Sequence, residues 1–104
     1  MTGKVFVGAV ADFAEDSMRA AKVNGREVLV IRQGGAFYAM EDRCTHDGGI
    51  LHDGELLDGA VKCTRHGAKF DLKTGRPTMP AVKKVRLYTT EVEDDKVYVH
   101  YQEA

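Results

Sequence analysis

Two short clusters of cysteine and histidine constrain this 104-residue chain more than any other feature of its sequence. The first is Cys44-Thr45-His46 and the second is Cys63-Thr64-Arg65-His66, with the 16 residues 47 to 62 between them. Together they offer two thiolates and two imidazoles, a set of ligands suited to zinc or to iron. Neither cluster can enclose a metal alone, because its two ligands lie too close in sequence. The two segments are therefore predicted to converge as loops on one metal centre.

Two kinds of metal centre suit this set. A structural zinc ion takes four ligands in a tetrahedron, usually from a pair of cysteines and a separate pair of histidines. A 2Fe–2S cluster of mixed ligation takes two cysteines on one iron and two histidines on the other. Each segment here mixes the two residue types, as C-x-H and C-x-x-H, which favours the iron–sulfur cluster. Buried thiols that bind nothing, or a disulfide between Cys44 and Cys63, stay open as plain alternatives.

The paired motif resembles that of the Rieske iron–sulfur family, in which C-x-H is followed, after a gap of similar length, by C-x-x-H. The resemblance covers the chain from about residue 5 to residue 101. Threonine follows each ligand cysteine here, where most of the family has proline, and this departure affects the fine tuning rather than the ligation. Further positions match the H-G-x-x-F-D-x-x-T-G run of the family and its proline-bearing loop: Gly67, Phe70, Asp71, Thr74, Gly75 and Pro80.

The resemblance implies one Rieske-type 2Fe–2S cluster, and this family also supplies the roles of its ligands. Thiolates would hold the iron that stays ferric, and neutral imidazoles would hold the iron that is reduced. In the family the imidazole edges face solvent, where a partner protein docks. We expect no catalytic residue, and we take His52 and His100 as non-ligands. The cofactor-binding residues, which are also the metal ligands, are predicted to be Cys44, His46, Cys63 and His66.

The resemblance also indicates the low-potential kind of Rieske protein. High-potential relatives carry a serine two residues after the second histidine and a tyrosine four residues after it, and both donate hydroxyl hydrogen bonds to cluster sulfur. Here Ala68 and Phe70 hold those positions and offer no hydroxyl. The disulfide that joins the loops in those relatives would fall on Gly49 and Arg65, which cannot form one.

Short apolar segments separated by turn residues predict an all-β fold of antiparallel strands. Asn24-Gly25, between segments 18–23 and 27–32, is typical of a tight hairpin. The unbroken run from Val28 to Ile31 predicts a strand buried on both faces. Segment 11–17 contains helix-forming residues, but the family resemblance favours a turn there. Other strands are expected over 5–10, 36–41, 54–57, 60–63, 82–92 and 96–101, with residues 63–71 as the second cluster loop.

These elements predict one Rieske-type domain over residues 1–104. Its strands would form a base that resembles a sandwich or barrel, and a cluster-binding part of two loops, about residues 43–80, would project from one end. The formal charge is −1, from 15 basic and 16 acidic residues, which argues against nucleic acid or a membrane surface as the partner. No segment approaches the roughly 20 apolar residues of a membrane span, and no secretory signal pattern is present.

The favoured interpretation is a Rieske ferredoxin that carries one electron and is not itself an enzyme. By resemblance, electrons would come from an NAD(P)H-dependent flavin reductase and pass to a terminal oxygenase. Oxygenase large subunits add a domain with a mononuclear iron held by two histidines and a carboxylate, and this sequence offers no such set. We expect a monomer. We also expect the protein in the cytoplasm, because thiols stay reduced in that compartment. The alternatives are a small Rieske-like subunit of a multisubunit oxidoreductase such as nitrite reductase, and a zinc-stabilised interaction module.

Overall fold

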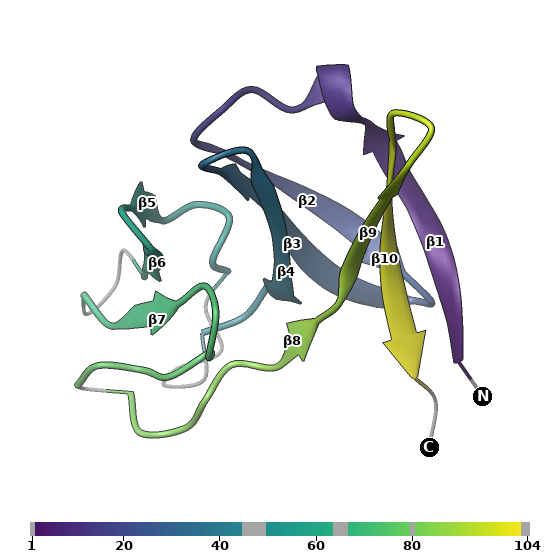
Figure 1. Ribbon diagram of the computed structural model, residues 1–104. Helices are drawn as coiled ribbons and strands as arrows, with labels where there is room; N and C mark the ends of the chain where they lie inside the picture. The colour runs from purple at the N-terminus through teal and green to yellow at the C-terminus, as the bar shows by residue number, and fades with distance from the viewer. Residues whose placement is uncertain (1, 45–49, 64–66, 80, 103–104) are drawn as a thin grey trace.

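The computed structural model describes residues 2–44, 50–63, 67–79 and 81–102 (Figure 1). The predicted all-β fold is confirmed, because these residues form three antiparallel sheets and a single turn of 3-10 helix. No helix in the described part of the chain has the length and apolar character needed to cross a bilayer. The elements are β1 (Thr2–Ala9), η1 (Val10–Asp12), β2 (Ser17–Val23), β3 (Arg26–Gln33), β4 (Ala36–Glu41), β5 (Glu55–Leu57), β6 (Ala60–Lys62), β7 (Lys69–Asp71), β8 (Leu87–Tyr88), β9 (Thr90–Glu93) and β10 (Lys96–Gln102).

Two of the sheets form the base of the molecule. One has the strand order β1-β10-β9 and the other β2-β3-β4-β8. The third sheet, β5-β6-β7, lies to one side of the base in Figure 1. The predicted base with a cluster-binding part at one end therefore describes the arrangement, although that part contains a small sheet as well as loops.

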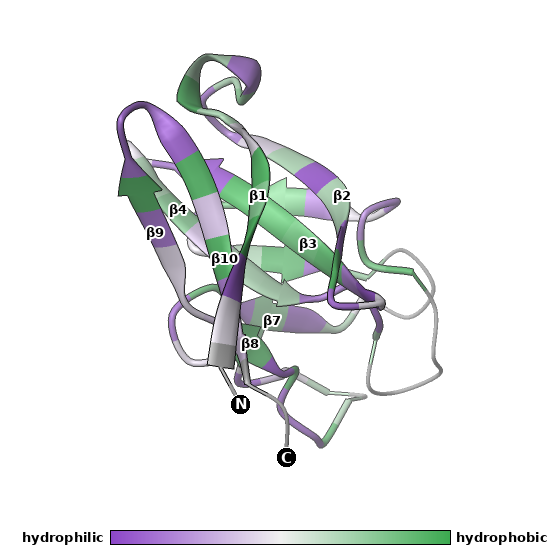
Figure 2. Ribbon diagram, turned by 90° about the vertical axis from the view of Figure 1, so that its right-hand side faces the viewer, coloured by the Kyte–Doolittle hydropathy of each residue, from purple (hydrophilic) through white to green (hydrophobic). Residues whose placement is uncertain are grey.

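Strand β3 separates two apolar cores, which explains its unbroken run of aliphatic residues. Successive side chains of a strand point to opposite faces. Val28 and Val30 pack in the core of the base, whereas Leu29 and Ile31 pack in the core beneath the cysteine loops. All four are fully buried, and the middle of the strand is hydrophobic (Figure 2). The predicted burial on both faces is confirmed.

The tight turns follow from the backbone that their residues tolerate. Asn24 and Gly25 have φ angles of 52° and 80°, as a two-residue hairpin of this hand requires. They join Val23 to Arg26, which are paired across β2 and β3. The turn between β9 and β10 uses Asp94 and Asp95, both also at positive φ. The hairpin predicted at Asn24-Gly25 is confirmed.

The prediction of one strand over 82–92 is wrong. The chain forms β8 and β9 instead, which belong to different sheets because β8 pairs with β4 and β9 with β10. Before β8, the Val85 N–H donates to the Gly75 carbonyl at 3.0 Å, so this stretch pairs with a loop rather than with a strand. Residues 63–71 are also not all loop, since Lys69–Asp71 form β7.

Candidate metal centre

The two cysteines lie at the feet of the two predicted cluster loops. Cys44 follows β4 by three residues, and Cys63 comes directly after β6. Both side chains are buried, and both belong to one apolar core that also contains Leu51 and Phe70. Both are free cysteines in this structure. The structure thus brings the two predicted sulfur ligands into one core from segments far apart in sequence.

The two predicted histidine ligands, His46 and His66, lie outside the described residues, as do Gly49, Arg65 and Pro80. Within the described part of the chain, no three residues of metal-binding type converge, as expected when half of the predicted set is not described. The residues that are present fit the predicted cluster in one respect. Two buried thiols in one core are the donors that iron in a 2Fe–2S cluster requires.

The second loop is closed by backbone hydrogen bonds at its base. Cys63 N–H donates to the Ala68 carbonyl at 2.7 Å, and Gly67 N–H donates to the Cys63 carbonyl at 3.1 Å. Gly67 has a φ of 76°, and among the described residues a side chain there would meet the end of Lys62, at 3.6 Å. Turn geometry is therefore sufficient to explain this glycine.

Asp71 braces the segment that follows. Its Oδ1 accepts hydrogen bonds from the backbone N–H groups of Lys73 at 2.8 Å and Thr74 at 3.0 Å. These two bonds favour the charged form and lower the pKa of Asp71. The turn needs glycine at position 75, because its φ is 73° and an added Cβ would lie 2.5 Å from the Val85 carbonyl oxygen.

Ala68 and Phe70, the two positions at which high-potential relatives carry hydroxyl groups, are completely buried. They pack in the same core as Cys44 and Cys63. Neither side chain can donate a hydrogen bond. The surroundings of the two sulfur atoms are therefore apolar on the side that this core provides.

The first loop is closed by a contact that the sequence reasoning missed. Asp42 Oδ1 accepts a hydrogen bond from the His52 N–H at 2.8 Å, and Asp42 Oδ2 lies 2.6 Å from His52 Nδ1. The Asp42 side chain is fully buried, while that of His52 is about one-third exposed. The bond to Asp42 is the main cause that raises the pKa of His52, with Asp53 and Glu27 adding to it against a smaller effect of burial. An aspartate and a histidine that flank the loop were the available signal.

Gln33 makes a second contact that the sequence did not reveal. Its Nε2 donates to the Leu57 carbonyl at 2.8 Å, and its Oε1 accepts from the Gly59 N–H at 2.7 Å. Gln33 ends β3, whereas Leu57 ends β5 and Gly59 lies in the β5–β6 turn. One side chain therefore attaches the third sheet to the base.

His100 lies on β10, in one of the two sheets of the base. Its Nε2 is 2.7 Å from Glu91 Oε1, and Glu91 also accepts from Lys4 at 3.1 Å. His100 is thus engaged in an ion-pair network of the base. That His52 and His100 are non-ligands stays a prediction.

Comparison with known proteins agrees with these features. A family model described as the Rieske [2Fe-2S] domain matches residues 3–89. The anthranilate 1,2-dioxygenase ferredoxin subunit of Burkholderia cepacia is 34% identical over 95 residues, 90% of this chain and 88% of that protein. The ferredoxin of carbazole 1,9a-dioxygenase from Nocardioides aromaticivorans IC177 matches with a TM-score of 0.89 and 31% identity, over 92% of this chain and 95% of that one. A chain in a complex of reduced oxygenase and oxidized ferredoxin in carbazole 1,9a-dioxygenase matches with a TM-score of 0.87 and 33% identity, over 92% and 91%.

Proposed function

Because this chain belongs to the Rieske [2Fe-2S] domain family, we propose that it is a Rieske ferredoxin, which carries single electrons to a terminal oxygenase. The observation that carries the proposal is the placement of two buried thiols, Cys44 and Cys63, in one apolar core. A relative is the ferredoxin subunit of a dioxygenase, and a matching structure is a ferredoxin–oxygenase complex. The chain is accordingly an electron-transfer component and not an enzyme.

The cofactor is one Rieske-type 2Fe–2S cluster. Cys44 and Cys63 would hold it through sulfur, and His46 and His66 through ring nitrogen; the histidine assignment rests on the sequence motif. When bound, the cluster supplies a one-electron couple, at roughly −150 to +300 mV for this type of ligation.

The residues around the thiols favour the lower part of that range. Hydrogen bonds to cluster sulfur and exposure to solvent are among the properties that set the potential. The buried Ala68 and Phe70 provide no donor from their side of the core, and the thiols themselves are shielded from water. The chain thus packs buried apolar side chains against one side of the sulfur ligands.

The remaining features of the proposal extend beyond the relatives' names. The electron donor is an NAD(P)H-dependent flavin reductase, and the protein works in the cytoplasm, where thiols stay reduced. The whole chain, residues 1–104, acts as one domain and as a monomer, with the cluster-binding part at about residues 43–80.

Spectroelectrochemical titration of the purified holoprotein tests this function. We expect one electron per chain, taken up and released over repeated cycles, with a midpoint in the lower half of the range from roughly −150 to +300 mV. Release of iron on each cycle, or uptake of no electron in this range, would contradict the function of a reusable carrier.

A further inference from the structure

The end of the molecule that carries both cysteines is basic, and the rest is acidic. Residues 43–86 contain nine lysines and arginines against five aspartates and glutamates, a formal charge of +4. The remaining residues contain six basic and eleven acidic side chains, a formal charge of −5. The near-zero total charge therefore conceals a strong division along the molecule, and such divisions orient charged partners as they approach.

An exposed apolar strip lies on this basic end. Met79 and Val82 are each 76% exposed, more than any other large hydrophobic residue that the structure describes. Ala81, between them, is buried in the core that contains Cys44 and Cys63. The inner side of the strip therefore packs against the sulfur core while two large apolar side chains point to solvent.

The strip is held in place by hydrogen bonds to β7. The Thr78 N–H donates to the Lys69 carbonyl at 2.9 Å, and Thr78 Oγ1 accepts from the Lys69 N–H at 2.9 Å. The Ala81 N–H then donates to the Thr78 carbonyl at 3.1 Å. Because this backbone is already ordered, docking on it would lose little conformational entropy.

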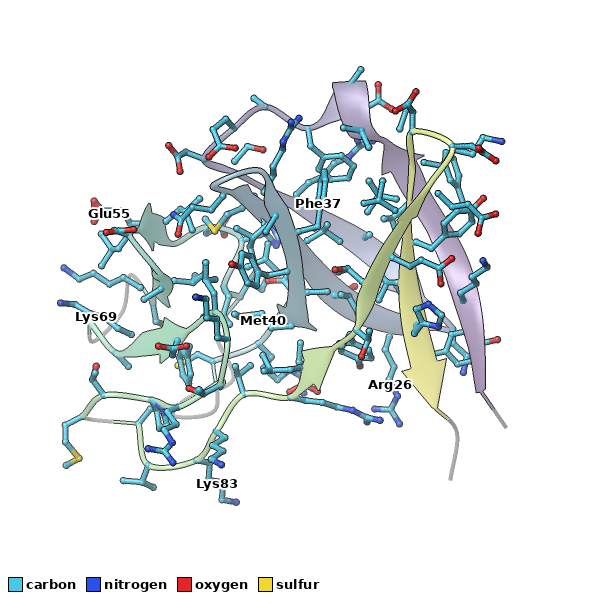
Figure 3. All side chains as sticks on the ribbon, viewed as in Figure 1. Arg26, Phe37, Met40, Glu55, Lys69 and Lys83 are labelled. Carbon is cyan, nitrogen blue, oxygen red and sulfur yellow. The ribbon has the colours of Figure 1, made fainter. Side chains whose placement is uncertain are left out.

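Lysines surround the strip. Lys69, Lys83 and Lys84 are all exposed, and Figure 3 shows Lys69 and Lys83 on the side of the molecule away from β1, β9 and β10. Carboxylates also occur on this side, among them Glu55 (Figure 3). Asp71 is the carboxylate nearest in sequence to Lys69, and its Oδ1 accepts hydrogen bonds from two backbone N–H groups.

We propose that Thr78, Met79 and residues 81–84, together with Lys69, form the docking surface for a redox partner protein whose own surface presents carboxylates around an apolar centre. The proposal rests on the proposed function, because an electron partner must approach the end that holds the cluster. Opposite charges across an interface speed encounter and fix orientation, and the apolar centre excludes water from the contact. Nucleic acid fits this surface less well, because the exposed side chains of the strip include no aromatic ring on which bases could stack.

Stopped-flow electron transfer tests the charge of the partner. Reduced holoprotein is mixed with two protein acceptors of opposite charge, the acidic blue-copper protein plastocyanin and the basic cytochrome c. We expect faster transfer to plastocyanin at low salt and a steep fall in that rate as salt rises. Lys69→Glu, Lys83→Glu and Lys84→Glu should each lower it by about threefold or more. Lys96→Glu, the same change on an exposed lysine of β10, is the matched control and should leave it nearly unchanged.

The apolar part is tested at high salt, where charge steering is screened. Met79→Ser and Val82→Ser should each slow transfer to plastocyanin there. Val92→Ser, on an exposed valine of β9, is the control and should not.

Iron content and midpoint potential, measured for every variant, separate the two levels of the proposal. A wild-type protein without a reducible cluster refutes the proposed function, and the docking surface falls with it. A reducible cluster whose transfer is unaffected by the three lysine variants, or is faster to cytochrome c, overturns the docking surface alone. Tight binding of oligothymidylate at physiological salt, lost in the lysine variants while transfer is kept, would assign the strip to nucleic acid and overturn it as well.

Discussion

Asp42 and His52 are joined by two hydrogen bonds, of 2.8 Å to the His52 N–H and 2.6 Å to its ring Nδ1. Asp42 lies two residues before Cys44, and its own N–H donates to the Glu27 carbonyl of β3 at 3.1 Å. The first loop is therefore closed at its base and attached to the base sheet by residues that are not predicted ligands. A side chain outside the ligand set thus holds the segment that contains the ligands.

Asp42→Ala should weaken this closure. The variant leaves the His52 N–H without its acceptor and removes a buried carboxylate that the ring contacts, which should cost about 1–3 kcal/mol of stability. Asp42→Asn keeps one amide oxygen as an acceptor and should cost less. Urea unfolding of the two variants, monitored through the loss of visible colour, measures both changes in stability. Equal stability of wild type and Asp42→Ala would show that the contact contributes nothing.

The raised pKa of His52 predicts a dependence of stability on pH. The hydrogen bond to Asp42 raises it above the ordinary value of 6.5, so the folded state binds the proton more tightly than the unfolded state. The resulting stability is fully present below about pH 6.5 and is lost as pH rises through the folded pKa. The thermal midpoint of wild type minus that of His52→Gln should therefore decrease between about pH 6 and pH 9. A constant or growing difference would contradict this linkage.

Hydroxyl groups introduced behind the sulfur ligands should raise the midpoint potential. Ala68→Ser and Phe70→Tyr restore donors at two buried positions, and a hydrogen bond to sulfur stabilises the more negative, reduced state. A net bond of about 1 kcal/mol corresponds to roughly 40 mV for one electron. Ala39→Ser adds a hydroxyl in the other core and is the control. Voltammetry that finds an unchanged or lower potential, with iron content intact, would refute the assignment of these positions.

Gln33→Ala should loosen the attachment of the third sheet to the base. It removes the donor to the Leu57 carbonyl and the acceptor for the Gly59 N–H, each worth about 0.5–1.5 kcal/mol. Because Gln33 is not in the sulfur core, we expect faster loss of colour on heating but an unchanged midpoint potential. Gln33→Glu, which keeps an acceptor for Gly59 and loses the donor, should lose its colour at a rate between those of wild type and Gln33→Ala. A shift in potential without a change in stability would be the opposite result.

The sequence predicts those parts of the fold that depend on neighbours in the chain. Asn24-Gly25 specifies a hairpin because both residues tolerate positive φ, and the run from Val28 to Ile31 specifies a strand between two cores. The break between β8 and β9 is not encoded in such a pattern. Nor is the late start of β8, because the Val85 N–H before it donates to the carbonyl of Gly75, a loop residue whose position depends on the whole fold.

The candidate site likewise has a part that the sequence predicts and a part that it does not. The spacing of Cys44 and Cys63 with their neighbouring histidines suggests the ligands, because the motif is local to each loop. The contact from Asp42 to His52 left only the signal of two polar residues that flank the loop, and the contact from Gln33 to the β5–β6 turn left none, because each joins segments whose proximity only the folded chain creates. The basic character of the end that carries the cysteines was also not apparent, since the total charge of the chain is close to zero.

Iron and acid-labile sulfide per chain, determined on aerobically purified protein, test the central claim most directly. The ligand set of Cys44, His46, Cys63 and His66 predicts two irons and two sulfides in the wild type. It predicts the same content in His52→Ala and loss of both elements in Cys44→Ser and His66→Ala, since a cluster lacking a ligand is not retained. One zinc per chain without sulfide, or loss of iron in the His52→Ala variant, would contradict the account.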